Sequence, residues 1–227
     1  MSVAAHPEKL VVVGNGMAGL RLLEELDRAG RDRFAITVVG SEPEPAYNRV
    51  LLSSLLAGDA TRGDIALRSR GWYAERGIDL VTGVPAVSID AGARTLALGD
   101  GRSLAFDRLV LATGADPIKL PLPGRELDGV LTFRSSADVG QMLERARGGA
   151  PAIVIGGGLL GIEAAYGLAR AGVSVTLVHV MDRLMERQLD AEGAALLARA
   201  LEAKGIRVLL RTETKTIHGT TCVEAIE

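Results

Sequence analysis

Two short glycine-rich stretches carry the clearest chemistry in the sequence. They read GNGMAG over residues 14–19 and GGGLLG over residues 156–161, and both fit the spacing G-x-G-x-x-G. The first glycine permits a tight turn, the second lets a pyrophosphate approach the backbone, and the third lets a helix pack on a strand. The N–H groups and the dipole of a helix N-terminus then favour the anion. The spacing predicts two dinucleotide sites.

Each stretch lies between an apolar run and a helical pattern, which is the context that the motif needs. Residues 10–13 predict a buried strand, a leucine stripe from Leu20 predicts a helix to about Gly30, and residues 34–39 predict a second strand. The second half repeats this order. It has predicted strands at 152–155 and 173–178 around a helix at 162–171.

The remaining patterns extend the alternation of strands and helices. Alternating elements of this kind indicate an α/β fold with parallel, doubly wound sheets. We expect two Rossmann-like three-layer domains, a first over residues 1–118 and a second over 119–227, joined by a proline-rich connector. Further helices are expected at 50–56, 70–76, 135–147 and 190–204, and further strands at 78–81, 86–90, 94–98, 103–106, 108–112, 206–210 and 222–226.

Charged residues near the ends of the second strands bear on nucleotide choice. Glu42 is the nearest carboxylate after the first unit's second strand, where an acidic residue should hold a ribose hydroxyl. In the repeat, His179 takes the strand-end place and Arg183 follows four residues later. A carboxylate there favours NAD and a cation accommodates the 2′-phosphate of NADP, so the choice stays open.

Composition excludes several other classes of protein. The 227 residues carry 26 Lys and Arg against 28 Asp and Glu, and this balance argues against a nucleic-acid surface. The single cysteine, Cys222, is expected to be a small buried apolar residue, and it cannot form an internal disulfide or a cysteine-rich metal site. Residues 1–10 lack a secretory signal, and no apolar run approaches the ~18 residues of a membrane span. We expect a cytoplasmic protein without a metal site.

With the segment LVLATGA at residues 109–115, the two loops resemble the pyridine nucleotide–disulfide oxidoreductases, a family of flavoproteins with two dinucleotide sites. The resemblance implies FAD on the first loop and NAD(P)H on the second, with NADH slightly favoured. Hydride passes from NAD(P)H to the flavin and electrons pass on to a redox acceptor. No protein acid, base or nucleophile is then required, because the cofactor carries the chemistry.

The segment EPEPAYNRVLLSSLLAG at residues 42–58, with GWY at 71–73, is most similar to the N-terminal flavin module of the NAD(P)H-dependent nitrite reductase large subunit. Disulfide reductases carry a cysteine pair, which is absent. Ser54 stands where peroxidases and oxidases carry a cysteine, and where ferredoxin and rubredoxin reductases often carry a lysine. The implied partner is an iron–sulfur, siroheme or ferredoxin/rubredoxin-type acceptor, and a homodimer is common in the relatives.

The motifs and the resemblance together give the candidate binding residues. By resemblance, Glu163 positions the nicotinamide, Arg49 and Arg134 contact FAD, and residues 113–114 lie near it. The FAD set is Gly14, Gly16, Met17, Ala18, Gly19, Glu42, Arg49, Ser54, Thr113, Gly114 and Arg134. The NAD(P) set is Gly156, Gly158, Leu159, Leu160, Gly161, Glu163, His179 and Arg183.

The family also has a third motif, a strand ending in Gly-Asp that holds the flavin after the NAD domain. The Gly-Asp pairs at 58–59, 63–64 and 99–100 all precede the second loop. The resemblance therefore implies an incomplete FAD domain, a truncated NAD(P)H domain, weak or absent FAD binding, and an exposed sheet edge that favours association. Three alternatives stay open: a nucleotide-binding fragment without turnover, a ferredoxin/rubredoxin reductase-type electron-transfer flavoprotein, and a single-Rossmann dehydrogenase with a degenerate second loop.

Overall fold

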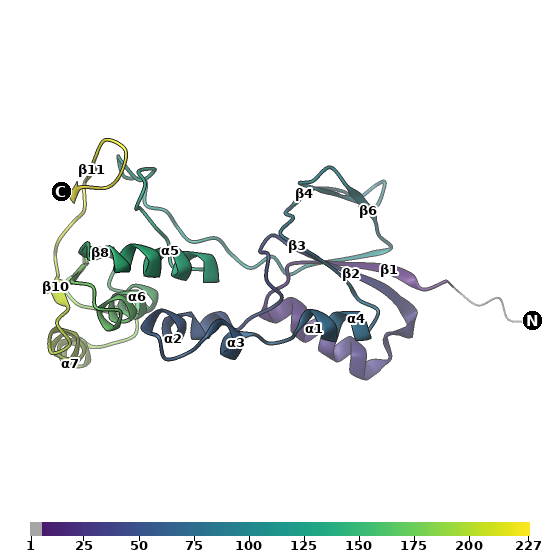
Figure 1. The fold of residues 1–227 in the computed structure, drawn as a ribbon, viewed down its shortest axis with the longest axis horizontal. Helices are drawn as coiled ribbons and strands as arrows, with labels where there is room; N and C mark the ends of the chain where they lie inside the picture. Colours follow the sequence, from purple (N-terminus) through teal and green to yellow (C-terminus); the bar gives the residue numbers. More distant parts are fainter. Residues whose placement is uncertain (1–5) are drawn as a thin grey trace, which may run out of the picture. The chain divides into compact units, whose positions relative to one another are not determined.

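The computed structural model describes residues 6–227, apart from the side chain of Arg31. These residues form two compact units (Figure 1). The first contains the chain up to Asn48 and Ile65–Ala115, and the second contains Arg49–Asp64 and Asp116–Glu227. Residues 1–5, on which the expected lack of a secretory signal partly rests, lie outside the described part.

The first unit is built on a four-stranded parallel sheet in the order β3-β2-β1-β7. The strands are β1 (Glu8–Val13), β2 (Phe34–Gly40), β3 (Asp79–Thr82) and β7 (Arg108–Leu111), and helix α1 (Met17–Ala29) joins β1 to β2. Strand β1 has hydrogen-bonded neighbours on both sides. Its apolar run without alternation is typical of a parallel strand that is covered on both faces.

Helices cover one face of this sheet (Figure 1). Leu10 and Val12 of β1 pack in one core with Leu20 and Leu23 of α1. Tyr73 of α4 (Arg70–Glu75) belongs to the same core and is 1% exposed. Successive residues of a strand point to opposite faces, so this helix layer uses alternate residues of β1.

A small antiparallel sheet covers the other face. It consists of β4 (Ala86–Asp90), β5 (Thr95–Leu98) and β6 (Ser103–Ala105) in sequence order. Val11 and Val13 of β1 pack in a second core that includes Leu96 and Leu98 of β5. The first unit therefore has three layers, as predicted.

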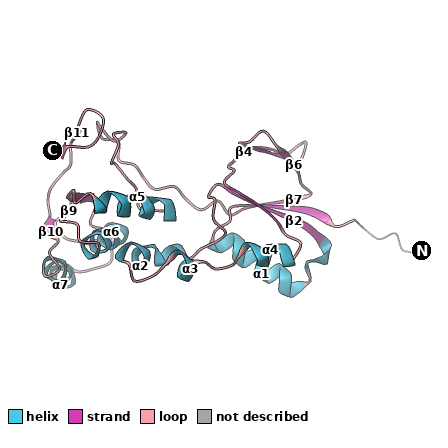
Figure 2. Cartoon of the chain, in the orientation of Figure 1, coloured by secondary structure: helices cyan, strands magenta, loops and turns pink. Residues whose placement is uncertain are grey.

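The second unit repeats the parallel arrangement with three strands in the order β10-β9-β8. Figure 2 distinguishes its strands, in magenta, from its helices, in cyan. These are β8 (Ala152–Ile155), β9 (Val175–Val178) and β10 (Arg207–Leu209). Helix α6 (Leu159–Arg170) packs against β8 and β9, and α7 (Ala191–Glu202) packs against β10. The predicted strand–loop–helix–strand order is confirmed in both units.

One segment of the second unit comes from early in the sequence. Helix α2 (Leu52–Ala57) packs on α6 and on α5 (Ser136–Arg147). A Cβ at Gly167 of α6 would lie 2.7 Å from the Leu56 side chain, so a glycine permits this contact. The predicted division into residues 1–118 and 119–227 did not anticipate that residues 49–64 belong to the second unit. That the first part binds FAD and the second binds NAD(P)H stays a prediction.

The C-terminal part differs from expectation. The strand expected over 222–226 is reduced to β12 (Ala225–Ile226), which pairs antiparallel with β11 (Ile217–His218). Cys222 is exposed, so the expectation of a buried thiol was wrong. Its backbone forms only an isolated β-bridge with Asp128, so no strand buries it.

Among residues 6–227 no helix is long and apolar enough to cross a membrane. The same residues hold no group of three His, Cys, Asp or Glu side chains that could bind a metal ion.

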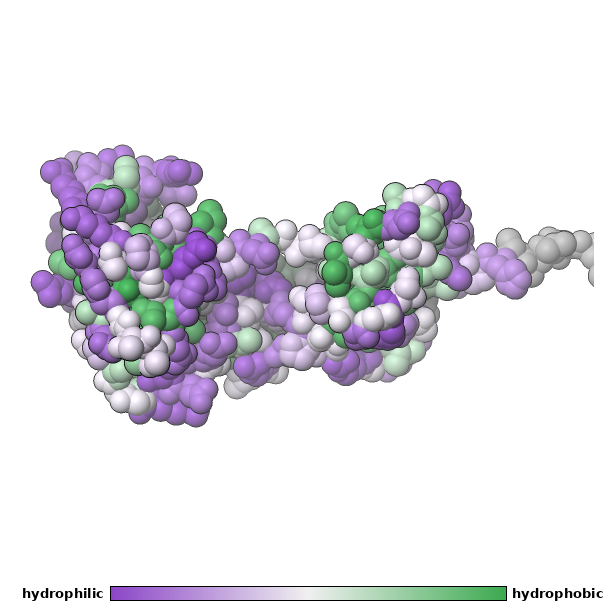
Figure 3. All heavy atoms as spheres, turned by 90° about the horizontal axis from the view of Figure 1, so that it is seen from above, coloured by the Kyte–Doolittle hydropathy of each residue, from purple (hydrophilic) through white to green (hydrophobic). Residues whose placement is uncertain are grey.

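Apolar side chains reach the surface of both units (Figure 3). Strands β7 and β8 lie at the edges of their sheets. Leu111 of β7 is exposed, as are Ile153 and Ile155 of β8. Large exposed apolar residues elsewhere include Met17, Val50, Val87, Ile118, Leu159, Leu160, Val180, Met181 and Leu196.

Candidate nucleotide-binding sites

The first loop can be built only with glycine at its two ends. Gly14 has φ +111°, and a Cβ there would lie 2.1 Å from the Ala112 carbonyl oxygen. A Cβ on Gly19 would lie 2.2 Å from the Gly14 carbonyl oxygen, so this glycine permits close packing of α1 on the loop. Gly16 differs, because a Cβ there would meet nothing within 4 Å.

The second loop shares part of this geometry, although a Cβ on Gly156, unlike one on Gly14, would meet nothing within 4 Å. Gly156 has φ +120°, and a Cβ on Gly161 would lie 2.0 Å from the Gly156 carbonyl oxygen. Gly158, like Gly16, faces space in which a Cβ would have no neighbour within 4 Å. The middle glycine of each loop is thus not required by internal packing. It leaves room for a group that approaches the backbone.

The helix that follows each loop starts without a side-chain cap. Gly16 precedes α1 and Gly158 precedes α6, and neither helix start has a side-chain capping hydrogen bond. The first N–H groups of a helix have no partner within the helix, and they carry partial positive charge. Open space at Gly16 and Gly158 beside these N–H groups fits a pyrophosphate. The first-turn residues Met17, Ala18, Leu159 and Leu160 are all exposed.

Each loop is held against the end of the neighbouring strand. The Gly14 N–H donates to the Val39 carbonyl and the Gly156 N–H donates to the Val178 carbonyl, each at 2.8 Å. The residues after β2 and β9 therefore lie beside their loops. Glu42 follows β2 by two residues and is half-buried, with its carboxylate accepting from the Tyr47 hydroxyl at 2.5 Å.

A hydrogen bond that the sequence did not reveal connects the first loop to α4. The Tyr73 hydroxyl donates to Asn15 Oδ1 at 2.9 Å. Burial raises the pKa of Tyr73, which keeps the hydroxyl protonated as a donor. The polar role of Tyr73 was hidden because 58 residues separate the partners.

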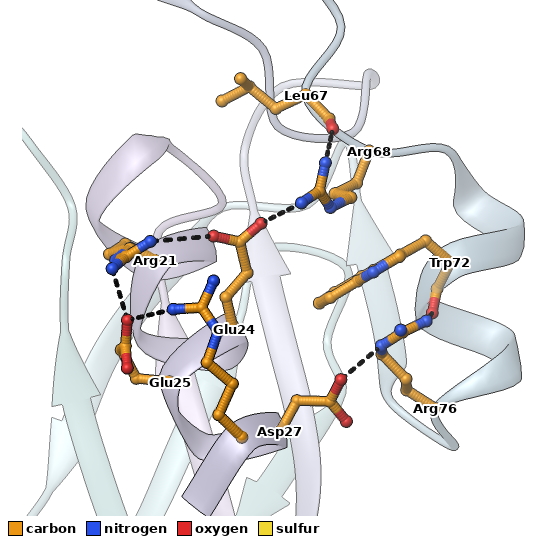
Figure 4. Close-up of polar contacts among 9 residues, drawn as sticks. Arg21, Glu24, Glu25, Asp27, Leu67, Arg68, Trp72 and Arg76 are labelled. Atoms are coloured by element: carbon orange, nitrogen blue, oxygen red, sulfur yellow. Dashed lines mark hydrogen bonds and ion pairs between the residues drawn. The ribbon is translucent and has the colours of Figure 1, made fainter.

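Ion pairs attach the helix that carries Tyr73 to α1 (Figure 4). Arg68 contacts Glu24 at 2.5 Å and Arg76 contacts Asp27 at 2.9 Å. The Arg76 guanidinium also lies over the Trp72 ring, 4.4 Å from its centroid. Together these contacts fix α4 against the helix that follows the glycine loop.

His179 lies inside the second unit rather than at its surface. The residue is 9% exposed, and its Nδ1 accepts from the Gly157 N–H at 3.1 Å. Its Nε2 lies 3.2 Å from Glu186 Oε2. Because Nδ1 accepts, the ring proton is assigned to Nε2, which donates to Glu186. Both ring nitrogens are therefore occupied by contacts within the unit.

Arg183 and Glu163 have different surroundings. The Arg183 guanidinium donates to Asp182 at 3.2 Å and to the Glu186 carbonyl at 3.4 Å. Glu163 lies in the first two turns of α6 and is half-buried, and burial raises the pKa of its carboxyl.

The remaining predicted FAD residues divide between the units. Thr113 and Gly114 follow β7 in the first unit, and both are exposed. In the second unit Arg49 donates to the Arg134 carbonyl at 3.0 Å, so the structure brings these two predicted residues together. Ser54 lies in α2 of that unit, and its carbonyl accepts from the Asp59 N–H.

Comparison with known proteins decides the family. The family model described as pyridine nucleotide-disulphide oxidoreductase matches residues 8–227. The chain belongs to this family. Membership confirms the predicted α/β fold and the cofactor pair of FAD and NAD(P)H, and it places the chain in a family of oxidoreductases.

Two proteins of Bacillus subtilis (strain 168) are similar over 96% of this chain. One is an assimilatory nitrate reductase electron transfer subunit, 43% identical, of which the alignment covers 28%. The other is a nitrite reductase [NAD(P)H], 44% identical, covered over 27%. The chain thus spans about a quarter of the length of these curated relatives.

A solved relative has the same fold. The NAD-dependent persulfide reductase from A. fulgidus matches with a TM-score of 0.85 and 32% identity, over 93% of this chain and 41% of its own.

Proposed function

We propose that this chain is the electron-input module of a nitrite reductase large-subunit type of enzyme. NAD(P)H binds at residues 156–161, FAD binds at residues 14–19, and electrons leave for a redox acceptor domain or protein. The observation that carries the proposal is the pair of matched glycine loops, each with an open middle glycine and an uncapped helix. The similarity to a nitrite reductase [NAD(P)H] over 96% of the chain supports the choice of acceptor class.

The residues of the chain bind and orient the cofactors rather than react. The two loops hold pyrophosphates on backbone N–H groups, and Glu42 accepts a ribose hydroxyl of FAD. Arg49, Arg134 and Ser54 contact the flavin cofactor, as do residues 113–114. Bound flavin supplies the ability to take a hydride and release electrons singly. Residues 1–118 serve FAD and residues 119–227 serve NAD(P)H.

Glu163 is proposed to lie against the nicotinamide. It lies in the first two turns of α6, the helix that follows the second loop, and burial raises the pKa of its carboxyl. Location in the cytoplasm and assembly as a homodimer complete the proposal.

An anaerobic absorption experiment tests the function. The purified chain is mixed with excess FAD, its visible flavin spectrum is recorded, and NADH is added. We expect the flavin band to bleach, because hydride from NADH reduces the flavin. An unchanged flavin band, with both nucleotides shown to be bound, would contradict the proposal.

A loop variant provides the control. Gly158→Val fills the open space at the second loop without an internal clash, so NADH should no longer bleach the band. NADH oxidation by a carbonyl substrate without added FAD would instead support a single-Rossmann dehydrogenase.

A further inference from the structure

The end of β9 lacks the carboxylate that usually binds the adenosine ribose of NAD. His179 occupies that place, and both of its nitrogens are used within the unit. It can neither accept a hydroxyl proton from a ribose nor contact a 2′-phosphate while these bonds hold. Another residue must therefore decide between NADH and NADPH.

The structure places the Glu186 side chain next to His179, and so near the end of β9. Its Oε2 lies 3.2 Å from His179 Nε2, and a quarter of its side chain is exposed. A carboxylate accepts several hydrogen bonds on two oxygens, so the contact with His179 leaves capacity for a ligand hydroxyl. A hydrogen bond from its own backbone N–H lowers the pKa of Glu186 most, and the hydrogen bond from His179 lowers it further. Both contacts keep the carboxylate charged.

The backbone fixes this carboxylate relative to the glycine loop. The Met185 N–H donates to the Gly157 carbonyl at 3.0 Å. Met185 has φ +49°, a left-handed conformation that is rare for a residue with a side chain. Leu184 is fully buried, and a Cβ on Gly157 would lie 2.7 Å from its side chain. Residues 184–186 are thus packed on the loop that receives the pyrophosphate.

Arg183, the cation predicted to accommodate a 2′-phosphate, is engaged within the unit. Arg183 is held by Asp182 and by the Glu186 carbonyl. Arg187 is exposed and stabilises the charge of Glu186. A 2′-phosphate at the end of β9 would meet the Glu186 carboxylate, whereas a 2′-hydroxyl would donate to it.

We infer that Glu186, held by His179, is the specificity-determining residue that accepts the adenosine ribose hydroxyl and selects NADH over NADPH. This inference rests on the proposed function, because it requires the nicotinamide cofactor at residues 156–161. It assigns His179 as a positioning residue that joins Glu186 to the Gly157 N–H.

Direct binding of NADH and of NADPH to the full 227-residue chain, by titration calorimetry, tests the inference without flavin turnover. Glu186→Gln keeps an oxygen for His179 Nε2 and removes the charge. We expect the wild-type preference for NADH to fall by about tenfold or more, since a hydrogen bond to a charged group contributes about that factor. The preference falls through weaker NADH binding and stronger NADPH binding. Glu202→Gln, an exposed carboxylate on α7, is the matched control and should leave the ratio unchanged.

A second measurement tests the positioning role of His179 independently of nucleotide preference. Nitrogen NMR of the His179 ring should show a proton on Nε2 in the wild type, and its signal should shift when NADH binds. A ratio for Glu186→Gln equal to that of Glu202→Gln would overturn the inference and leave the proposed function standing. A wild-type preference for NADPH that Arg187→Gln removes would also overturn it. Failure of the wild type to bind either nucleotide would overturn the proposed function together with the inference.

Discussion

At the scale of single residues, neighbouring glycines of the second loop have separable tasks. A Cβ on Gly157 would lie 2.7 Å from ring carbons of His179, whereas a Cβ on Gly158 would meet nothing within 4 Å. We predict that Gly157→Ala lowers the free energy of unfolding by about 1–3 kcal/mol, through overpacking. Gly158→Ala should lose less stability but more NADH affinity. Urea denaturation and NADH titration of both variants measure this, and equal effects would contradict it.

Glu163 gives a prediction about pH. Burial raises its folded pKa above the ordinary value of 4.5, so the folded state is penalised when the carboxyl ionises. Stability is therefore lost as pH rises from the unfolded pKa through the folded pKa, and it is not regained above it. Glu163→Gln should unfold at a higher temperature than the wild type at pH 7 and at nearly the same temperature at pH 3.5. A difference of the same size at both values would show that the carboxyl charge is not the cause.

Residue types alone predicted the glycines, but not the partners of the polar side chains. The loop glycines follow from a backbone requirement that the motif encodes, and the structure shows it at Gly14 and Gly156. His179 was assigned by its distance along the chain from the loop. Sequence distance cannot show that its ring turns inward to Gly157 and Glu186. Tyr73 and Asn15 were missed as a pair for the same reason.

At the scale of elements, the α2–α6 contact depends on one glycine. A Cβ on Gly167 would lie 2.7 Å from Leu56 Cγ and 3.0 Å from its Cβ, atoms that cannot move freely. We predict that Gly167→Ala destabilises the chain by about 1–3 kcal/mol, despite alanine's better helix propensity. Gly71→Ala in α4 is the matched control, because its closest atom is an ordinary 3.5 Å away. That variant should be neutral or slightly stabilising. Thermal unfolding that ranks the two variants the other way round would refute the packing argument.

The elements themselves were largely predictable, whereas their docking was not. Apolar β-branched runs and leucine stripes marked β1, β2 and α1 because burial imposes those periods. The helix expected over 50–56 exists as α2, but no local signal shows that it packs on α6. The strand expected near the C-terminus shortened to β12, since its partner β11 is only two residues long.

At the scale of the whole molecule, the second unit contains a segment that lies early in the chain. Residues 112–122 have no regular secondary structure, and Lys119 among them is exposed. We predict that limited trypsin treatment cleaves after Lys119, because exposed irregular backbone is the preferred site. The two pieces should still elute together from a native sizing column, since α2 packs on α6 and Arg170 contacts Asp59 at 3.0 Å.

Denaturing conditions should separate the trypsin pieces, and Lys119→Gln should suppress this cut. Pieces that part in native buffer would show that residues 49–64 do not hold to the second unit.

The most direct test of the account is separate binding of FAD and NADH to two loop variants. Gly16→Val and Gly158→Val each fill space that is open in the structure, so neither should disturb its unit. We predict that Gly16→Val loses FAD affinity and keeps NADH affinity, and that Gly158→Val does the reverse, both measured by titration calorimetry. Loss of both nucleotides in either variant, or of neither, would contradict the claim that the two loops are separate sites for two nucleotides.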